Sequence, residues 1–183
     1  MTVQTQDMVP GVLAETSAAK LTLLPPVARF SLRARAMAVP ALSGALGAEL
    51  PARIGVRANV GDVEALCLGP DEWQILAPES AAPKLVQVFA VVYTTTPHSL
   101  TEISDRELTI RIDGPRAAEL LTLGCPRDID TIGAGQGRRT LFDGATVLIW
   151  RDGDQSFRMD IWRSFVPHVL SLLETGCREL TGD

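Results

Sequence analysis

The two histidines of this chain are the first residues to examine for chemistry, because nucleophilic triads and metal sites both rely on imidazole. His98 follows Pro97 in a threonine-rich stretch, and His168 lies in the first turn of a predicted helix. Both settings favour ordinary surface histidines. The sequence has no Cys-x-x-Cys or His-x-x-x-His spacing, so a metal site would need ligands from distant segments. We therefore predict no metal-binding residues.

Cys125 is the strongest candidate for a nucleophile, since it follows Gly124 at the end of a predicted helix. The partial negative charge of a helix C-terminus disfavours a thiolate, so this position argues against activation. Cys67 lies inside a predicted strand and is expected to be a small core residue. Asp71 and Glu72 are adjacent in a turn and are expected to diverge, whereas an acid–base pair must face a shared centre. We predict no catalytic residues.

The glycine-rich stretch 133–137 is the one candidate for a phosphate-binding loop. It lacks the Lys-Ser/Thr of a P-loop, and the residues after it predict a strand rather than a phosphate-binding helix N-terminus. A flexible loop is the better interpretation. Asp128 and Asp130, just before it, are expected to cap or close a loop. We predict no cofactor-binding residues in this chain.

Composition excludes several classes of protein. The chain has 183 residues, 46% of them hydrophobic, and a net charge of −5, which argues against a nucleic-acid partner. Arginines such as Arg33, Arg57, Arg111 and Arg158 are scattered, and we interpret them as solvated strand faces. No apolar run approaches the roughly 18 residues of a membrane span. Three widely spaced cysteines and an N-terminus without a secretory signal predict a cytoplasmic protein with reduced thiols and no membrane partner.

The elements that position these residues follow one plan twice. In the first half, alternation predicts strands at 30–34, 63–68 and 73–77, and helical spacing predicts helices from Pro40 to Pro51 and over 85–92. In the second half, strands are predicted at 108–112, 146–150 and 157–161. Helices are predicted after Pro115 and from Ser164, as the N-cap, to Gly176. A short strand at 101–104 joins the halves.

This repeated order predicts an α+β protein of two tandem ferredoxin-like βαββα repeats. We expect residues 1–26 to form a flexible N-terminal tail, 27–104 the first repeat and 105–183 the second, in one fused globular unit. A single alternating α/β sheet is disfavoured because short turns join the paired strands.

The tryptophans differ in expected role. Trp73 begins a strand and is predicted to be in the core. Trp162 lies on the strand face opposite to Met159 and Ile161. It is therefore either exposed as part of a partner surface or packed at the edge of the core.

Several separate motifs carry a resemblance to a known family. The most specific is Ala-Leu-Cys-Leu-Gly-Pro-Asp-Glu-Trp at 65–73, whose turn joins two predicted strands. Others are Ser104-Asp105-Arg106, Leu-x-Ile-x-Ile-Asp-Gly-Pro-Arg-Ala ending at Ala117, Gly-Cys-Pro-Arg-Asp at 124–128, Arg139-Thr140 and Arg163-Ser164-Phe165. In this order, from about Arg29 to Glu174, the chain resembles the gamma subunit of heterotetrameric sarcosine oxidase.

The resemblance implies a complex with alpha, beta and delta subunits that oxidatively demethylates sarcosine to glycine and passes the one-carbon unit to tetrahydrofolate. It implies that FAD, FMN, NAD and tetrahydrofolate are bound by partner subunits, with zinc in the smallest. The gamma subunit of this family is similar in fold to the folate-binding part of the glycine-cleavage T-protein. It is expected to be a structural, non-catalytic member that contacts the alpha subunit most directly.

Two positions depart from the family pattern. A bulky aromatic residue is common where Cys67 stands, and an aliphatic one where Gln74 stands. These departures leave open whether the substrate is sarcosine or a related N-methylated amine. The alternative function is a stand-alone tetrahydrofolate-binding protein, such as an aminomethyltransferase or an iron–sulfur maintenance factor. The Lys-Gly-Cys motif of the maintenance factors is replaced here by Leu123-Gly124-Cys125.

Overall fold

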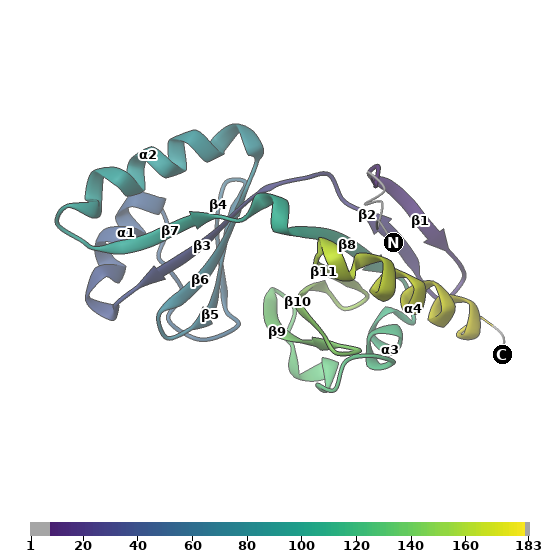
Figure 1. Ribbon diagram of the computed structural model, residues 1–183. Helices are drawn as coiled ribbons and strands as arrows, with labels where there is room; N and C mark the ends of the chain where they lie inside the picture. The colour runs from purple at the N-terminus through teal and green to yellow at the C-terminus, as the bar shows by residue number, and fades with distance from the viewer. Residues whose placement is uncertain (1–7, 182–183) are drawn as a thin grey trace.

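The chain forms an α+β structure with two antiparallel sheets, in a computed structural model that describes residues 8–181. The first sheet contains β3 (Ala28–Ala34), β4 (Arg57–Val60), β5 (Val63–Gly69), β6 (Glu72–Ala77) and β7 (His98–Glu102). The second contains β1 (Gly11–Glu15), β2 (Lys20–Leu23), β8 (Glu107–Asp113), β9 (Gln136–Phe142), β10 (Ala145–Gly153) and β11 (Ser156–Trp162). We call each sheet with its helices a half of the molecule. The halves lie side by side (Figure 1).

Each half covers one face of its sheet with two helices (Figure 1). These are α1 (Val39–Leu46) and α2 (Ala82–Tyr93) in the first half, and α3 (Ala117–Thr122) and α4 (Val166–Glu179) in the second. Alternating strand residues point toward the helices and form the two cores, centred on Phe30, Leu32 and Trp73 in one half and on Ile110, Ile149 and Phe157 in the other. The predicted core positions of Trp73 and Cys67 are confirmed.

The two sheets share a strand order. The first has the order β4-β5-β6-β3-β7, and the second has β9-β10-β11-β8-β2-β1 when it is read from the corresponding edge. The strand beside β3 is β7, which follows α2 directly in the chain. Its counterpart beside β8 is β2, which comes from the N-terminus.

The expectation of a flexible N-terminal tail is therefore wrong for residues 11–23, which contain β1 and β2. β2 pairs with β8 from Lys20↔Asp113 to Leu23↔Ile110, and Leu21 and Leu23 are buried in the second core. The physical reason is that no strand follows α4 among the described residues, so β8 would otherwise present an unpaired edge. Residues 1–7 of the predicted tail lie outside the described residues.

The predicted strands and helices are present, with four added strands and some shifted ends. β1, β2, β4 and β9 were not predicted, and the strand expected at 101–104 is β7, which ends at Glu102. Residues 136 and 137 of the supposed flexible loop belong to β9. α1 ends before Gly47, which has a φ of 80°, rather than at Pro51. Ser164 makes no side-chain cap to α4, and Gly176 lies within that helix. A Cβ at Gly176 would lie 2.5 Å from Leu123 Cδ1, so this glycine permits close packing of α4 rather than ending it.

Among the described residues, every helix is too short or too polar to cross a membrane.

Candidate functional site

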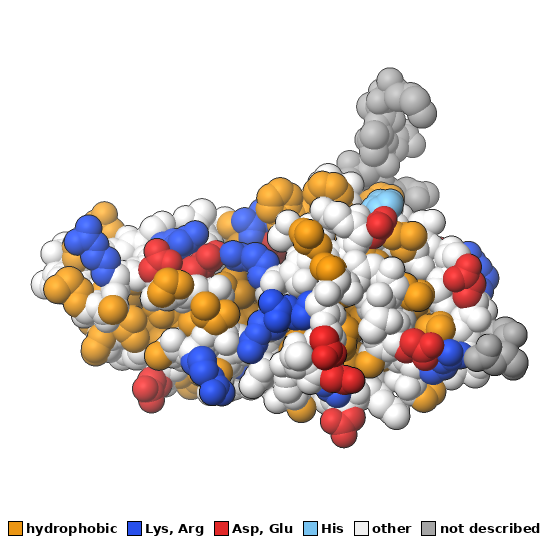
Figure 2. All heavy atoms as spheres, turned by 90° about the horizontal axis from the view of Figure 1, so that it is seen from below, with side chains coloured by type: hydrophobic (Ala, Val, Ile, Leu, Met, Phe, Trp, Pro, Cys, Tyr) orange, Lys and Arg blue, Asp and Glu red, His pale blue; other side chains and the backbone are white. Residues whose placement is uncertain are grey.

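The strand faces that point away from the helices meet each other, and this contact between the two sheets is the candidate site. We call it the seam. Its apolar part is formed by Leu66 and Leu76 from the first sheet and Leu148 and Trp150 from the second. The alternation of β11 puts Phe157, Met159 and Ile161 in the core, so Arg158, Asp160 and Trp162 face the seam instead. The seam therefore collects charged groups from both halves, and Figure 2 shows basic side chains along this boundary.

Arg29 and Asp160 form the buried centre of the seam. Arg29 Nη2 lies 3.3 Å from Asp160 Oδ1, and both side chains are almost completely buried. Arg29 also donates to Thr109 Oγ1 and to the backbone oxygen of Glu107. The second oxygen of Asp160 accepts from Trp150 Nε1 at 2.7 Å and Gln74 Nε2 at 3.2 Å. A buried carboxylate with this many donors has its hydrogen-bonding needs met, and its contacts join the two sheets.

A hollow of about 280 Å³ opens above this centre. Glu107 lies at its floor and accepts from Arg106 Nη2 at 2.7 Å and from Gln74 Nε2 at 3.4 Å. Trp162 forms part of the wall and has Arg106 5.4 Å from its ring centroid. With 42% of its surface exposed, Trp162 is both accessible and packed against the seam, so the two predicted roles stay open.

A ring of four alternating charges lies over Trp150 at the other end of the seam. Arg57 and Glu64 come from the first half, and Asp152 and Arg158 from the second. Asp152 accepts from Arg57 Nη1 and Arg158 Nε, both at 2.7 Å, and Glu64 accepts from Arg158 Nη2 at 2.8 Å. Both guanidinium groups lie over the Trp150 ring, 5.3 and 5.1 Å from its centroid.

Charge compensation dominates the electrostatics of this ring. Burial acts to raise the pKa of Asp152, but hydrogen bonds from Arg158 and Arg57 outweigh it and lower that pKa below the ordinary value. Burial likewise opposes ionisation of Arg158, yet its bonds to Asp152 and its closeness to Glu64 raise the pKa of the guanidinium. The interpretation of Arg57 and Arg158 as solvated residues is therefore wrong. Their strand faces are polar because they meet another charged sheet.

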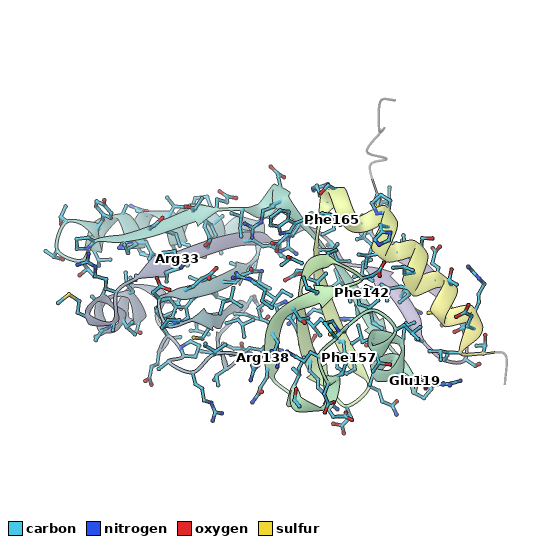
Figure 3. The ribbon with its side chains drawn as sticks, turned by 60° about the horizontal axis from the view of Figure 1, so that its bottom comes forward. Arg33, Glu119, Arg138, Phe142, Phe157 and Phe165 are labelled. Carbon is cyan, nitrogen blue, oxygen red and sulfur yellow. The ribbon has the colours of Figure 1, made fainter. Side chains whose placement is uncertain are left out.

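The Gly-Pro-Asp-Glu corner joins β5 to β6, as predicted, and also reaches across the seam. Glu72 binds Arg139 of the second half through two hydrogen bonds of 2.6 and 3.1 Å. This bond is the main cause that lowers the pKa of Glu72. Asp71 and Glu72 do not diverge fully, because Arg33 lies 3.2 Å from one carboxylate and 3.4 Å from the other. Figure 3 shows Arg33 in the first half.

The glycine-rich stretch 133–137 is another inter-half contact rather than a phosphate cradle. Gly137 N–H donates to the backbone oxygen of Gly55 at 3.0 Å, and Gln136 forms an isolated bridge with Val56. A Cβ at Gly137 would lie 2.8 Å from Leu66 Cδ2. Arg138, labelled in Figure 3 between the halves, passes directly over Gly55.

The other candidates lie apart from the seam. His98 packs edge-on against Phe89 and Tyr93, and His168 is exposed with Nε2 2.8 Å from Asp143 Oδ2. Burial raises the pKa of the Cys67 thiol, and Cys125 Sγ lies 3.7 Å from Thr140 Oγ1. Asp128 caps a short turn by accepting from Asp130 N–H at 3.0 Å. In the described part of the chain, no cluster of His, Cys, Asp or Glu has the geometry to hold a metal ion.

Sequence reasoning did not identify the centre of the seam, Arg29, Gln74, Thr109, Trp150 and Asp160. Arg29, Gln74, Thr109 and Asp160 lie on outward-facing strand positions that carry mostly polar residues, which is the pattern of a solvated face. The available signal was Trp150, an aromatic residue in a phase where β10 also carries Leu148. An apolar outer phase on a predicted sheet indicates that this face is covered.

The fold is similar to that of the glycine-cleavage aminomethyltransferases. The chain superposes on the glycine-cleavage aminomethyltransferase T from Bartonella henselae with a TM-score of 0.64 and 15% identity, over 86% of this chain and 45% of that chain. At that identity the likeness shows the fold alone. It superposes more closely, with a TM-score of 0.84 and 28% identity, on a chain of the heterotetrameric sarcosine oxidase from Corynebacterium sp. U-96 in complex with pyrrole 2-carboxylate. This match covers 94% of this chain and 90% of that one.

Sequence relatives agree with the second match. Sarcosine oxidase subunit gamma of Corynebacterium sp. strain P-1 is 30% identical over 146 residues, 78% of this chain and 71% of the relative. The strain U-96 subunit is 32% identical over 136 residues, 73% of this chain and 65% of the relative. No protein-family model matches the chain. The chain belongs to the family of sarcosine oxidase gamma subunits, as its sequence motifs predicted.

Proposed function

We propose that this chain is the structural gamma subunit of a heterotetrameric oxidase that oxidatively demethylates sarcosine to glycine and passes the one-carbon unit to tetrahydrofolate. Its alpha, beta and delta partners carry the catalytic groups, and the chain docks mainly on the large alpha subunit. Support comes from the named relatives and from the superposition on a heterotetrameric sarcosine oxidase. In this role the chain holds partners in place and performs no step of the reaction itself.

The observation that carries the structural role is the internal pairing of the seam. Each of its carboxylates faces an arginine: Asp160 faces Arg29, Glu107 faces Arg106, Glu72 faces Arg139, and Glu64 and Asp152 face Arg57 and Arg158. A general acid or base must be free to exchange a proton with substrate near neutral pH. Carboxylates whose oxygens are already paired with guanidinium groups are poorly suited to that task. The geometry instead fits a rigid junction between two sheets.

Cofactors are proposed to belong to the partners. FAD, FMN and NAD are expected in the two larger partner subunits, zinc in the smallest, and tetrahydrofolate on the folate-binding partner. The seam does not fit these groups well, because Arg29, Arg139 and Arg158, which could bind a phosphate or a folate carboxylate there, already face carboxylates.

The repeated strand order also supports a finer interpretation of the fold. We interpret each half as one ferredoxin-like βαββα unit, with β7 and β2 as the added fourth strands. On this interpretation the seam is a junction between two copies of one unit.

The test is expression of the tagged chain alone and together with its three partner subunits. Alone, the purified chain should be colourless, without the visible absorbance of an oxidised flavin. Together, it should retain the flavin-containing partners, and omission of the chain should reduce assembly and sarcosine oxidation. Stoichiometric flavin on the isolated chain, or a fully assembled and active complex without it, would contradict the proposal.

The alternative function is tetrahydrofolate binding by the chain alone, which the T-protein-like fold supports. Isothermal titration calorimetry of the isolated chain with tetrahydrofolate separates the two. A dissociation constant in the micromolar range, which corresponds to a binding free energy of about −8 kcal/mol, would favour the alternative. Absence of heat at the same concentrations would favour the structural role.

A further inference from the structure

The two sheets differ by one strand at the same edge. In the second sheet, β1 lies outside β2, paired with it from Gly11↔Leu23 to Glu15↔Lys20. In the first sheet, β7 holds the position that corresponds to β2, and no described residue pairs with its outer side. Figure 1 shows β1 and β7 at the outer margins of their sheets. The first half therefore has an unfilled strand position whose filled counterpart is visible in the second.

The backbone of β7 has free hydrogen-bonding groups on that outer side. Ile103 N–H donates inward to the backbone oxygen of Arg29 at 2.8 Å, just beyond the β3–β7 register that runs from Ala34↔His98 to Phe30↔Glu102. Antiparallel pairs alternate between bonded and non-bonded positions. Thr101 and Ser99 therefore bond to β3, whereas the N–H and C=O groups of His98, Leu100 and Glu102 face outward.

An apolar groove runs beside this edge. It encloses about 510 Å³ between α2 and β7, and its lining includes Val86, Phe89, Tyr93 and Leu100. Val86 and Tyr93 are 47% and 54% exposed. The residues of β7 whose backbone groups face outward also turn their side chains to this groove, since His98 contacts Phe89 and Leu100 packs on the first core. One extended segment would satisfy the backbone groups and fill the groove together.

The second half shows how such a segment sits. β1 lies against α4, the counterpart of α2, and its Leu13 and Ala14 pack on the second core. The groove beside α2 lacks this cover among the described residues.

We propose that β7 is a docking edge for an extended segment of a partner subunit, which adds as a sixth, antiparallel strand. The charge and polarity of β7 specify that segment: an apolar residue opposite Leu100 fills the groove, and a basic residue lies opposite the exposed carboxylate of Glu102. The occupant is a partner rather than a second copy, because the chain superposes on one subunit of a heterotetrameric oxidase. This inference rests on the proposed function, and it names the surface that the proposed function left open.

The first experiment measures affinity for the partner subunits with tagged variants co-expressed in the full complex. Glu102→Pro removes an outward N–H without removing a bond to β3, and it should reduce recovery of partner subunits at least tenfold. Glu102→Ala keeps the N–H and should reduce the recovery of partner subunits by no more than about fivefold, which corresponds to the loss of one exposed ion pair. Val86→Glu should also reduce recovery at least tenfold, whereas Val91→Glu, 72% exposed on the same helix but outside the groove, should not.

The second experiment is amide hydrogen exchange of the wild-type chain, isolated and in the complex. The amides of Leu100 and Glu102 should exchange fast in the isolated chain and become protected in the complex, while Thr101 is protected in both. Partner recovery without this protection overturns the docking edge and leaves the proposed function standing. Failure of the wild-type chain to recover any partner overturns both. Protection that rises with the concentration of the isolated chain identifies a second copy as the occupant, which also overturns the inference.

Discussion

At the scale of single residues, Arg29 and Asp160 determine how the two sheets are held. Their side chains are buried and contribute one charge from each half, with Thr109, Trp150 and Gln74 completing the contacts. Breaking a buried pair leaves an uncompensated charge, which costs more than the pair itself contributes. Glu107, 3.8 Å from Arg29 Nε, is the remaining nearby carboxylate.

We expect Asp160→Ala to lower the free energy of unfolding by about 3–5 kcal/mol. Arg33 lies in β3, the strand that also carries Arg29, but its side chain is exposed. Arg33→Ala should lower the free energy of unfolding by less than about 1 kcal/mol. Urea unfolding followed by far-UV circular dichroism measures both. The double variant Arg29→Met with Asp160→Leu should recover part of the loss, because it removes both charges together. Equal losses for Asp160→Ala and Arg33→Ala would show that the buried pair is unimportant.

Glu72 and Asp152 predict the response of stability to acid. Their pKa values are lowered in the folded protein from the ordinary 4.5 and 3.8. Between each lowered value and the ordinary one, the unfolded chain binds more protons than the folded chain, so stability falls as pH falls. The contribution of each group is fully present above its ordinary pKa and is lost as pH falls through the folded value.

The free energy of unfolding should therefore be nearly constant from about pH 7 to pH 5 as far as these two groups are concerned, and should decline below about pH 4.5. Glu72→Gln should be less stable at pH 7 and should lose less on acidification than the wild-type chain. Denaturant unfolding at several pH values measures the slopes. Parallel curves for the two proteins would contradict the assignment.

At the scale of elements, the sequence predicted the main strands well and their outer faces poorly. Phe157, Met159 and Ile161 alternate regularly, and β11 lies where that pattern puts it. The same pattern marks Arg158 and Asp160 as outward, and only the packing of another sheet makes that direction buried. Alternation measures polarity, and a polar face has the same sequence whether it meets water or opposite charges. For this reason the charged part of the seam could not be found from the sequence, and only the apolar positions Leu148 and Trp150 indicated that this face is covered.

Glycines show the same limit within the helices. Gly176 was expected to end α4, since glycine is common after helix ends. It is instead a contact point, where a side chain would collide with Leu120 and Leu123 from the neighbouring α3 segment. Local preference cannot distinguish a glycine required by backbone conformation from one required by a close neighbour.

We expect Gly176→Ala to destabilise the chain by about 1–3 kcal/mol, because overpacking outweighs the gain in helix propensity. Gly44 provides the matched control within α1, where a Cβ would meet nothing within 4 Å. Gly44→Ala should stabilise the chain by about 0.5–1 kcal/mol. Thermal unfolding of both variants should shift in opposite directions. A stabilised Gly176→Ala variant would show that α4 moves away at little cost.

At the scale of the whole molecule, the N-terminal strands are part of the second half. Loss of β1 and β2 would expose the edge of β8 and remove Leu21 and Leu23 from the core. The sequence did not predict these two strands, because residues 1–26 have weak periodicity. The strand with which they pair, β8, is also distant along the chain. Only comparison of the two sheets shows that a strand is required beside β8.

Deletion of residues 1–23 should therefore lower the free energy of unfolding by several kcal/mol, since it removes buried leucines and leaves an unpaired edge. Size-exclusion chromatography should also show increased self-association. Deletion of residues 1–7 is the control for chain length and keeps both strands. If the longer deletion unfolds at the same temperature as the wild-type chain, the N-terminal strands are dispensable.

The pairing of β2 with β8 has a consequence for synthesis. Leu21 lies opposite Ile112, so β2, which is made before the first half, must wait until that half has emerged from the ribosome. Folding of the first half shortens the distance over which β2 must find β8. When Phe30 pairs with Glu102, the two chain segments that leave the first sheet start side by side, close to β2 and β8. The long loop between β2 and β8 is then closed by a folded unit, and its entropy has already been lost. Folding of the first half thus brings β2 close to β8 before the two strands pair.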